Sequence, residues 1–226
     1  MKHEFEKLIE LLKTKASVKQ DVFAKTKETF CLLKETAKSF IDELSTLYKQ
    51  KDERVKINLQ DINDYEFRVF IGGDLLVFHM HTNVFQYPKS HFFWQHSYFK
   101  EDPTRSYGGM IHVYNFLADS IQLNREKDLG FLIARIFINR ENHFVLEGQK
   151  QLNMMFRNLK DQVFDEPNQC RVIECLIEFS MNFELYIPPY KQVQTVSVKQ
   201  AQDFRRSIKM KTSKRLGFEF GIDKNY

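Results

Sequence analysis

Two histidines separated by one residue, His79 and His81, end the run GGDLLVFHMH, residues 72–81. The run is mainly apolar, as in a buried β-strand, and alternate residues of a strand project to the same face. Both imidazoles would then point to one side, where two neutral imidazoles can bind the same metal ion. The spacing is therefore compatible with a divalent metal cofactor.

A third metal ligand would come from the same central region of the chain. Four more histidines lie there, namely His91, His96, His112 and His143. A metal-dependent enzyme is therefore one function that these residues support. The alternative is that His79 and His81 are ordinary strand residues, on a face covered by a helix, by a partner or by solvent.

Arg105 lies in the polar stretch EDPTRSY, residues 101–107, beside several hydroxyl side chains. A guanidinium among hydroxyls on a loop can bind an anion. The alternative is a capped turn before a helix, because Asp, Ser and Pro favour such turns. The sequence lacks the GxxxxGK, GxGxxG, GxSxG and HExxH motifs, so no residue is assigned a catalytic role.

The C-terminal segment is rich in basic residues. Between residues 199 and 215 it contains a single acidic residue, Asp203, and seven basic ones: Lys199, Arg205, Arg206, Lys209, Lys211, Lys214 and Arg215. Phosphate contacts need Lys and Arg but no particular order, so this composition is sufficient for non-specific nucleic-acid binding. The alternatives are a membrane surface, or docking on the acidic centre of this chain or of a second copy.

Charge divides the chain into three parts. Residues 1–52 contain 11 basic and 9 acidic residues, residues 53–188 contain 14 and 18, and residues 189–226 contain 9 and 3. We therefore expect an N-terminal helical segment, a central α+β domain and a basic C-terminal segment with these bounds.

Apolar residues of the N-terminal segment recur at alternating intervals of three and four. This period predicts a long helix, or a helical hairpin that turns near residues 15–21. The stripe contains Phe23, Phe30, Leu33, Phe40, Leu44 and Leu47. It can pack across the sheet of its own chain or pair with a second copy as a dimer seam, and the sequence leaves both interpretations open.

After residue 53 the hydrophobic period changes to two, which predicts strands. The runs RVKINLQ, YEFRVFI and LLVFHMHTNVF predict a three-stranded antiparallel meander, and LGFLIARIFIN with HFVLEG predicts a hairpin. Between them, GGMIHVYNFLADSIQL has apolar residues at helical spacing and predicts a helix. The fold class is therefore α+β, with a five-stranded, mainly antiparallel sheet flanked by helices.

The three cysteines, Cys31, Cys170 and Cys175, lack the spacing of a disulfide framework, and no apolar signal region opens the chain. We therefore expect a cytoplasmic location. No run approaches the roughly 20 apolar residues of a transmembrane helix. Together these features favour a non-enzymatic, homo-oligomeric binding module, either a sensor or a nucleic-acid-associated regulator, over the metal-dependent enzyme.

Overall fold

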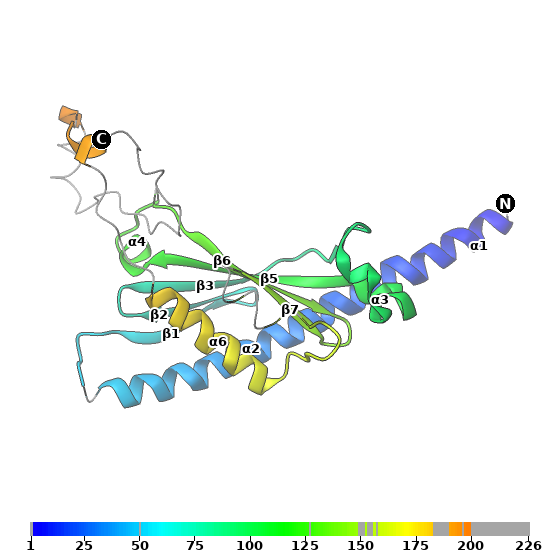
Figure 1. Ribbon diagram of the computed structural model, residues 1–226, viewed down its shortest axis with the longest axis horizontal. Helices are drawn as coiled ribbons and strands as arrows, with labels where there is room; N and C mark the ends of the chain where they lie inside the picture. The colour runs from blue at the N-terminus through cyan, green and yellow to red at the C-terminus, as the bar shows by residue number, and fades with distance from the viewer. Residues whose placement is uncertain are drawn as a thin grey trace.

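An antiparallel sheet and a long N-terminal helix dominate the fold (Figure 1). The computed structural model describes residues 2–49, 51–126, 128–148, 152, 156, 158–182, 190–195 and 197–199. The central strands follow the order β1-β2-β3-β5-β6-β7, and the short β4 pairs with β5. In chain order the strands are β1 (Ile57–Asn63), β2 (Glu66–Ile71), β3 (Asp74–Met80), β4 (Phe85–Gln86), β5 (Tyr107–Leu117), β6 (Phe131–Asn139) and β7 (Phe144–Gly148).

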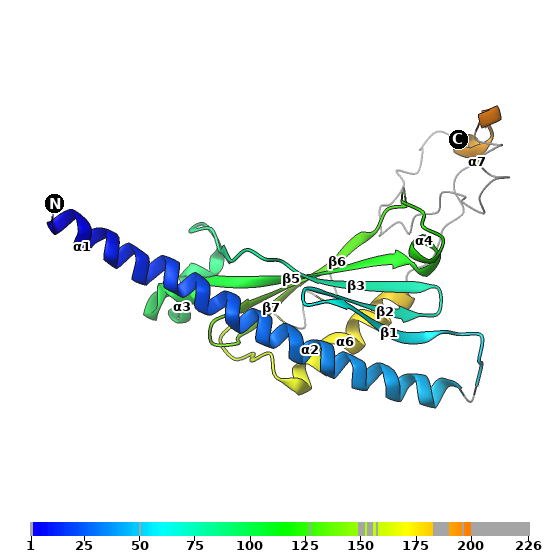
Figure 2. The ribbon, with the colours of Figure 1, turned by 180° about the vertical axis from the view of Figure 1, so that it is seen from behind.

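The N-terminal helix runs without a break through three parts. These are α1 (Lys2–Leu11), the π-helical segment η1 (Leu12–Ser17) and α2 (Val18–Lys49). The long helix is therefore confirmed, and the alternative hairpin is not formed, because the chain near residues 15–21 makes a wide helical turn instead of a loop. Figure 2 shows α2 lying across one face of the sheet and α1 extending beyond it.

A second helix, α6 (Glu166–Met181), lies beside α2 on the same face. Asp165 caps its first turn by accepting a hydrogen bond from the Asn168 amide at 3.2 Å. Thr36 of α2 donates to Gln169 of α6 at 2.9 Å, which links the two helices. Between the helices and the sheet lies the main core, whose largest fully buried side chains include Phe30, Leu33, Phe67, Phe78, Phe144, Phe156 and Phe164.

Two adjacent glycines of β5 make room for large side chains on the two faces of the sheet. A Cβ atom built on Gly109 would overlap the side chain of Thr26, which is fully buried. A Cβ atom on Gly108 would overlap the ring of Phe137 on the opposite face. The glycine pair in YGGM is therefore a packing requirement of β5, whereas Gly72, with φ of +57°, serves the turn between β2 and β3.

The prediction of a five-stranded sheet is not confirmed, because the sheet formed by the described residues has seven strands when the two-residue β4 is counted. The largest error concerns GGMIHVYNFL, which forms β5 and not a helix. Ile111 and Val113 pack in the main core, while Tyr114 and Phe116 join a small apolar cluster on the opposite face. A strand that is apolar on both faces loses its period of two, and its apolar residues then also fit helical spacing.

Among the described residues, the face opposite the two helices is covered only at its ends. At one end α4 (Ala118–Gln122) packs on Phe70 and Leu75. At the other end, an aromatic segment covers Phe137 and Val145. This segment, residues 85–106, contains the short helices η2 (Phe92–Gln95), α3 (Ser97–Glu101) and η3 (Pro103–Ser106). We call the part between these ends the open face.

Residues 190–195, which include the short helix α7 (Tyr190–Val193), and residues 197–199 are the described parts of the predicted basic segment, so most of that segment lies outside the described residues. Among the helices that the structure describes, none combines the length and apolar character needed to cross a bilayer.

Candidate functional site

One row of polar side chains crosses the open face over five strands. The strand registers pair Glu66 with His79, His79 with His112, His112 with Arg135, and Arg135 with Glu147. We call these five residues the polar rung. Alternation places them opposite the core residues of the same strands, which pack under α2 and α6.

The charges of the polar rung are paired near its two ends. Glu66 accepts a hydrogen bond from Nε of Arg68 at 2.7 Å, and its other oxygen lies 3.9 Å from Nδ1 of His79. At the far end Arg135 forms an ion pair with Glu147. The middle of the rung is thus occupied by imidazoles between two ion pairs.

His112 lies partly buried in the middle of the polar rung. Burial lowers the pKa of His112, and positive charge on His81, Arg135 and His79 lowers it further. Its Nε2 atom lies 3.0 Å from the sulfur of Met110. The ring of His81 is edge-on to that of His112, with centroids 6.1 Å apart, and its Nδ1 accepts a hydrogen bond from the Asn83 amide. These surroundings therefore favour the neutral form of His112.

The structure brings together three of the histidines considered as metal ligands, His79, His81 and His112, on one face. Within the described ranges, however, no group of three or more His, Cys, Asp or Glu side chains is placed to hold a metal ion. The other candidates have different surroundings. His91 lies in the aromatic segment against Tyr87, and His143 stacks on Tyr98 while its Nδ1 contacts the Leu159 carbonyl. His96 is exposed near Phe92 and Phe93.

A groove of about 460 Å³ adjoins the Arg135 end of the polar rung. It lies between β6, β7 and the aromatic segment, and its lining comprises His91, Phe92, Phe93, Leu132, Ile133, Ala134, Arg135, Val145, Glu147 and Gly148. Two of its apolar side chains remain accessible, because Phe92 is 50% exposed and Leu132 is 40% exposed. The groove thus combines an ion pair with accessible apolar surface.

Tyr87 places a hydroxyl group beside this groove. Its ring contacts His91 and Phe93, with centroids 4.6 and 5.0 Å apart. Burial raises the pKa of Tyr87, the charge of Glu147 raises it further, and the charge of Arg135 opposes this rise. The hydroxyl is buried, and no partner for it exists among the described residues. Because buried hydroxyls are normally hydrogen-bonded, this unpaired group is unusual.

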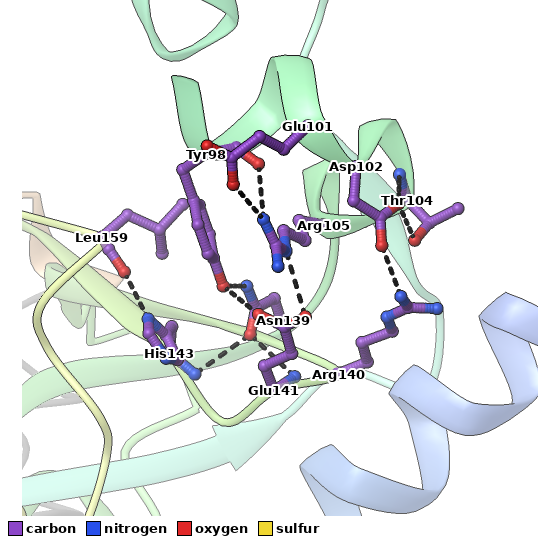
Figure 3. Close-up of polar contacts among 10 residues, drawn as sticks. All are labelled: Tyr98, Glu101, Asp102, Thr104, Arg105, Asn139, Arg140, Glu141, His143 and Leu159. Carbon is purple, nitrogen blue, oxygen red and sulfur yellow. Dashed lines mark hydrogen bonds and ion pairs between the residues drawn. The ribbon is translucent and has the colours of Figure 1, made fainter. Parts of the chain in front are cut away.

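Arg105 lies in a polar network within the chain (Figure 3). It forms ion pairs with Glu141 at 3.0 Å and Glu101 at 3.3 Å, and its guanidinium lies 4.4 Å from the ring centroid of Tyr98. Asp102 accepts a hydrogen bond from the Thr104 amide, so the stretch is a capped turn, but it precedes β5 and not a helix. The guanidinium predicted to bind an anion therefore faces two carboxylates of its own chain.

Glu141 joins this network to the β6–β7 turn. Burial disfavours its ionised form, but hydrogen bonds from Tyr98 and Arg105 outweigh burial and lower the pKa of Glu141. Asn139, which is fully buried, donates to the Tyr98 hydroxyl at 2.9 Å. The network therefore fixes the aromatic segment to the sheet, and with it one wall of the groove.

The residues of the predicted dimer seam mostly face their own sheet. Phe30 and Leu33 are fully buried in the main core, and Phe23, Phe40 and Leu44 pack against it while partly buried. Leu47 is 62% exposed. This placement agrees with the alternative in which the stripe packs within the chain. Of the predicted basic residues, Lys199 is exposed, whereas Arg205, Arg206, Lys209, Lys211, Lys214 and Arg215 lie outside the described residues.

Sequence reasoning missed Arg135, Glu147, Glu66 and Tyr87. Each is a single polar residue in a strand or an aromatic stretch, and only the strand register brings the first three together. The groove therefore had no local signature in the sequence. Comparison of the chain with protein-family models, curated proteins and solved structures gives no match, so its function has to be inferred from this geometry.

Proposed function

We propose that this chain is a non-enzymatic binding module whose ligand occupies the groove at the Arg135 end of the polar rung. The observation that carries the proposal is the Arg135–Glu147 ion pair in a groove with accessible apolar side chains. A volume of about 460 Å³ suits a small organic molecule, since ligand sites usually measure about 300–1,000 Å³.

The chemistry of the lining indicates the class of ligand. In the described part of the chain Arg135 makes one hydrogen bond, to Glu147, so further N–H donors of the guanidinium are available for a carboxylate. Phe92 offers a half-exposed ring for stacking, and Leu132 offers apolar contact. A small molecule with an acidic group and an aromatic ring matches this pattern, and benzoate and phenylacetate are its simplest probes.

This proposal is tested by amide NMR titration with benzoate and phenylacetate. We expect chemical-shift changes at Leu132, Arg135 and Gly148, with a millimolar Kd that is typical of fragments. Arg135→Gln should weaken binding at least tenfold. Arg68→Gln is the matched control, because Arg68 lies on the same face and pairs with Glu66 outside the groove. Equal weakening by both variants, or no shifts near the groove, would contradict the proposal.

Three broader features belong to the same proposal. The module is cytoplasmic, which is supported by three free cysteines. It associates with itself, and it acts as a sensor or as a nucleic-acid-associated regulator. Nucleic acid would bind through the basic segment between Lys199 and Arg215 and not through the groove, because the open face pairs its charges internally.

A further inference from the structure

The N-terminal helix α1 has an apolar face that no other described element covers. Its apolar residues are Phe5, Leu8, Ile9, Leu11 and Leu12 at the start of η1, all between 48 and 62% exposed. Phe5, Leu8, Ile9 and Leu12 follow the spacing of one helix face. A stripe of large apolar side chains exposed to this degree marks an interaction surface.

The position of α1 explains why this stripe remains exposed. Figures 1 and 2 agree that α1 extends past the sheet and past α3, with no strand or helix alongside it. Among the described elements, α1 makes extensive contact only with η1, the next part of the same helix. The stripe therefore stabilises nothing within the described chain.

Charge along α1 and η1 is arranged so that the surface complements itself. Residues 2–10 contain three Glu and two Lys, whereas residues 11–19 contain three Lys and no acidic residue. Glu6 and Lys13 are seven residues apart and flank the stripe on the same side. In an antiparallel pair related by a twofold axis, equivalent flanks face each other, so Glu6 of each copy lies near Lys13 of the partner subunit.

We propose that α1 is a self-association surface, and that two copies of this chain pair antiparallel through Phe5, Leu8, Ile9 and Leu12. A parallel pair would place the acidic first halves against each other, and it would also align the helix dipoles unfavourably. This inference rests on the self-association included in the proposed function and names the surface responsible for it. It moves the dimer contact from the buried stripe of α2 to the exposed stripe of α1.

The size of the surface sets the expected affinity. α1 is about 15 Å long, so a pair buries an area below the roughly 1,200 Å² of a small stable interface. We therefore expect a reversible monomer–dimer equilibrium with a Kd on the order of 10–100 µM.

Sedimentation velocity of the full chain from about 5 to 500 µM tests the proposal. Ile9→Glu should raise the dimer Kd at least tenfold, because it introduces a charge into the stripe. Leu47→Glu is the matched control, since Leu47 is as exposed as Phe5 but lies at the other end of the helix. It should leave the Kd unchanged. Both variants should keep the wild-type Tm, because neither side chain is buried.

A charge exchange tests the antiparallel orientation. Glu6→Lys should weaken the dimer by about threefold or more, and adding Lys13→Glu should restore it, because the double variant regains both intermolecular pairs. A wild-type chain that stays monomeric throughout would overturn the inference, as would a dimer that survives Ile9→Glu or a double variant that is not restored. A wild-type chain that stays monomeric but shows the expected benzoate titration would refute this inference alone and leave the groove proposal standing.

Discussion

His112 lies at the centre of the polar rung, and its surroundings determine how the open face responds to acid. The cross-strand neighbours of its imidazole are His79 on β3 and Arg135 on β6, and the ring of His81 is adjacent. None of these groups stabilises a positive charge on the His112 imidazole. The folded protein therefore favours the neutral form of His112, and a neutral imidazole can both donate and accept a hydrogen bond to a ligand.

We expect this histidine to destabilise the protein in mild acid. Folding lowers the pKa of His112 below its ordinary value of 6.5. Below that value the unfolded chain binds a proton that the folded chain resists, so the free energy of unfolding falls as pH decreases, whereas above it His112 has no effect. Denaturant unfolding at pH 7.5 and 5.5 should show a smaller difference for His112→Gln than for the wild type.

His96→Gln provides the control for that measurement, because His96 is exposed and lies away from the rung. The control should keep the wild-type difference between the two pH values. If both variants behave alike, the acid sensitivity does not arise from His112.

The contact between α2 and β5 determines the geometry of the whole helix–sheet layer. Thr26 packs directly on Gly109, and its hydroxyl donates to the Val22 carbonyl at 2.7 Å, which holds the side chain in place. The glycine pair is visible in the sequence, but its role in helix–sheet packing could not be predicted from it. That role depends on which residue of the helix crosses the strand, and no local pattern specifies the crossing point.

Gly109→Ala should destabilise the protein by about 1–3 kcal/mol, because the added methyl group forces α2 away from β5. Gly73→Ala should change stability by less than about 0.5 kcal/mol, since a Cβ at Gly73 meets nothing within 4 Å. Chemical unfolding of both variants measures the difference. Similar losses at the two positions would show that the close approach at Gly109 is not the cause.

The strand and helix predictions succeeded for the meander, for β6 and for the long helix, and they failed at β5. The meander and the long helix have clear periods because solvent reaches one side of β2 and of α2. In β5 the core covers one face, and α4 with the aromatic segment covers much of the other, so the period of two disappears. The polar rung could not be predicted without β5, because His112 joins His79 to Arg135 only through that strand.

The chain as a whole separates its charges: an acidic central domain is followed by a basic segment. We expect any nucleic-acid binding by this segment to be independent of sequence and to weaken steeply with salt, because released counterions drive it. The combined change of Arg205, Arg206 and Lys209 to Glu should abolish it. Fluorescence anisotropy with a short random duplex, at about 50 and 200 mM salt, measures both effects.

Arg135→Gln is the control for the nucleic-acid measurement, because it removes one positive charge from the central domain and leaves the basic segment intact. It should bind the duplex like the wild type. Binding that survives the triple reversal, or that hardly responds to salt, would show that the basic segment is not the contact.

The unbroken helix from α1 to α2 also has a consequence for helix formation itself. An isolated helix as short as α1 and η1 together is marginal in water, because its first turn is costly to form. Here α2 is held against the sheet and supplies that first turn, so α1 only needs to propagate from an existing end. Its amides should therefore exchange with solvent in a gradient, slowest near Val18 and fastest near Lys2. Pairing of two such helices would slow exchange along the entire stripe.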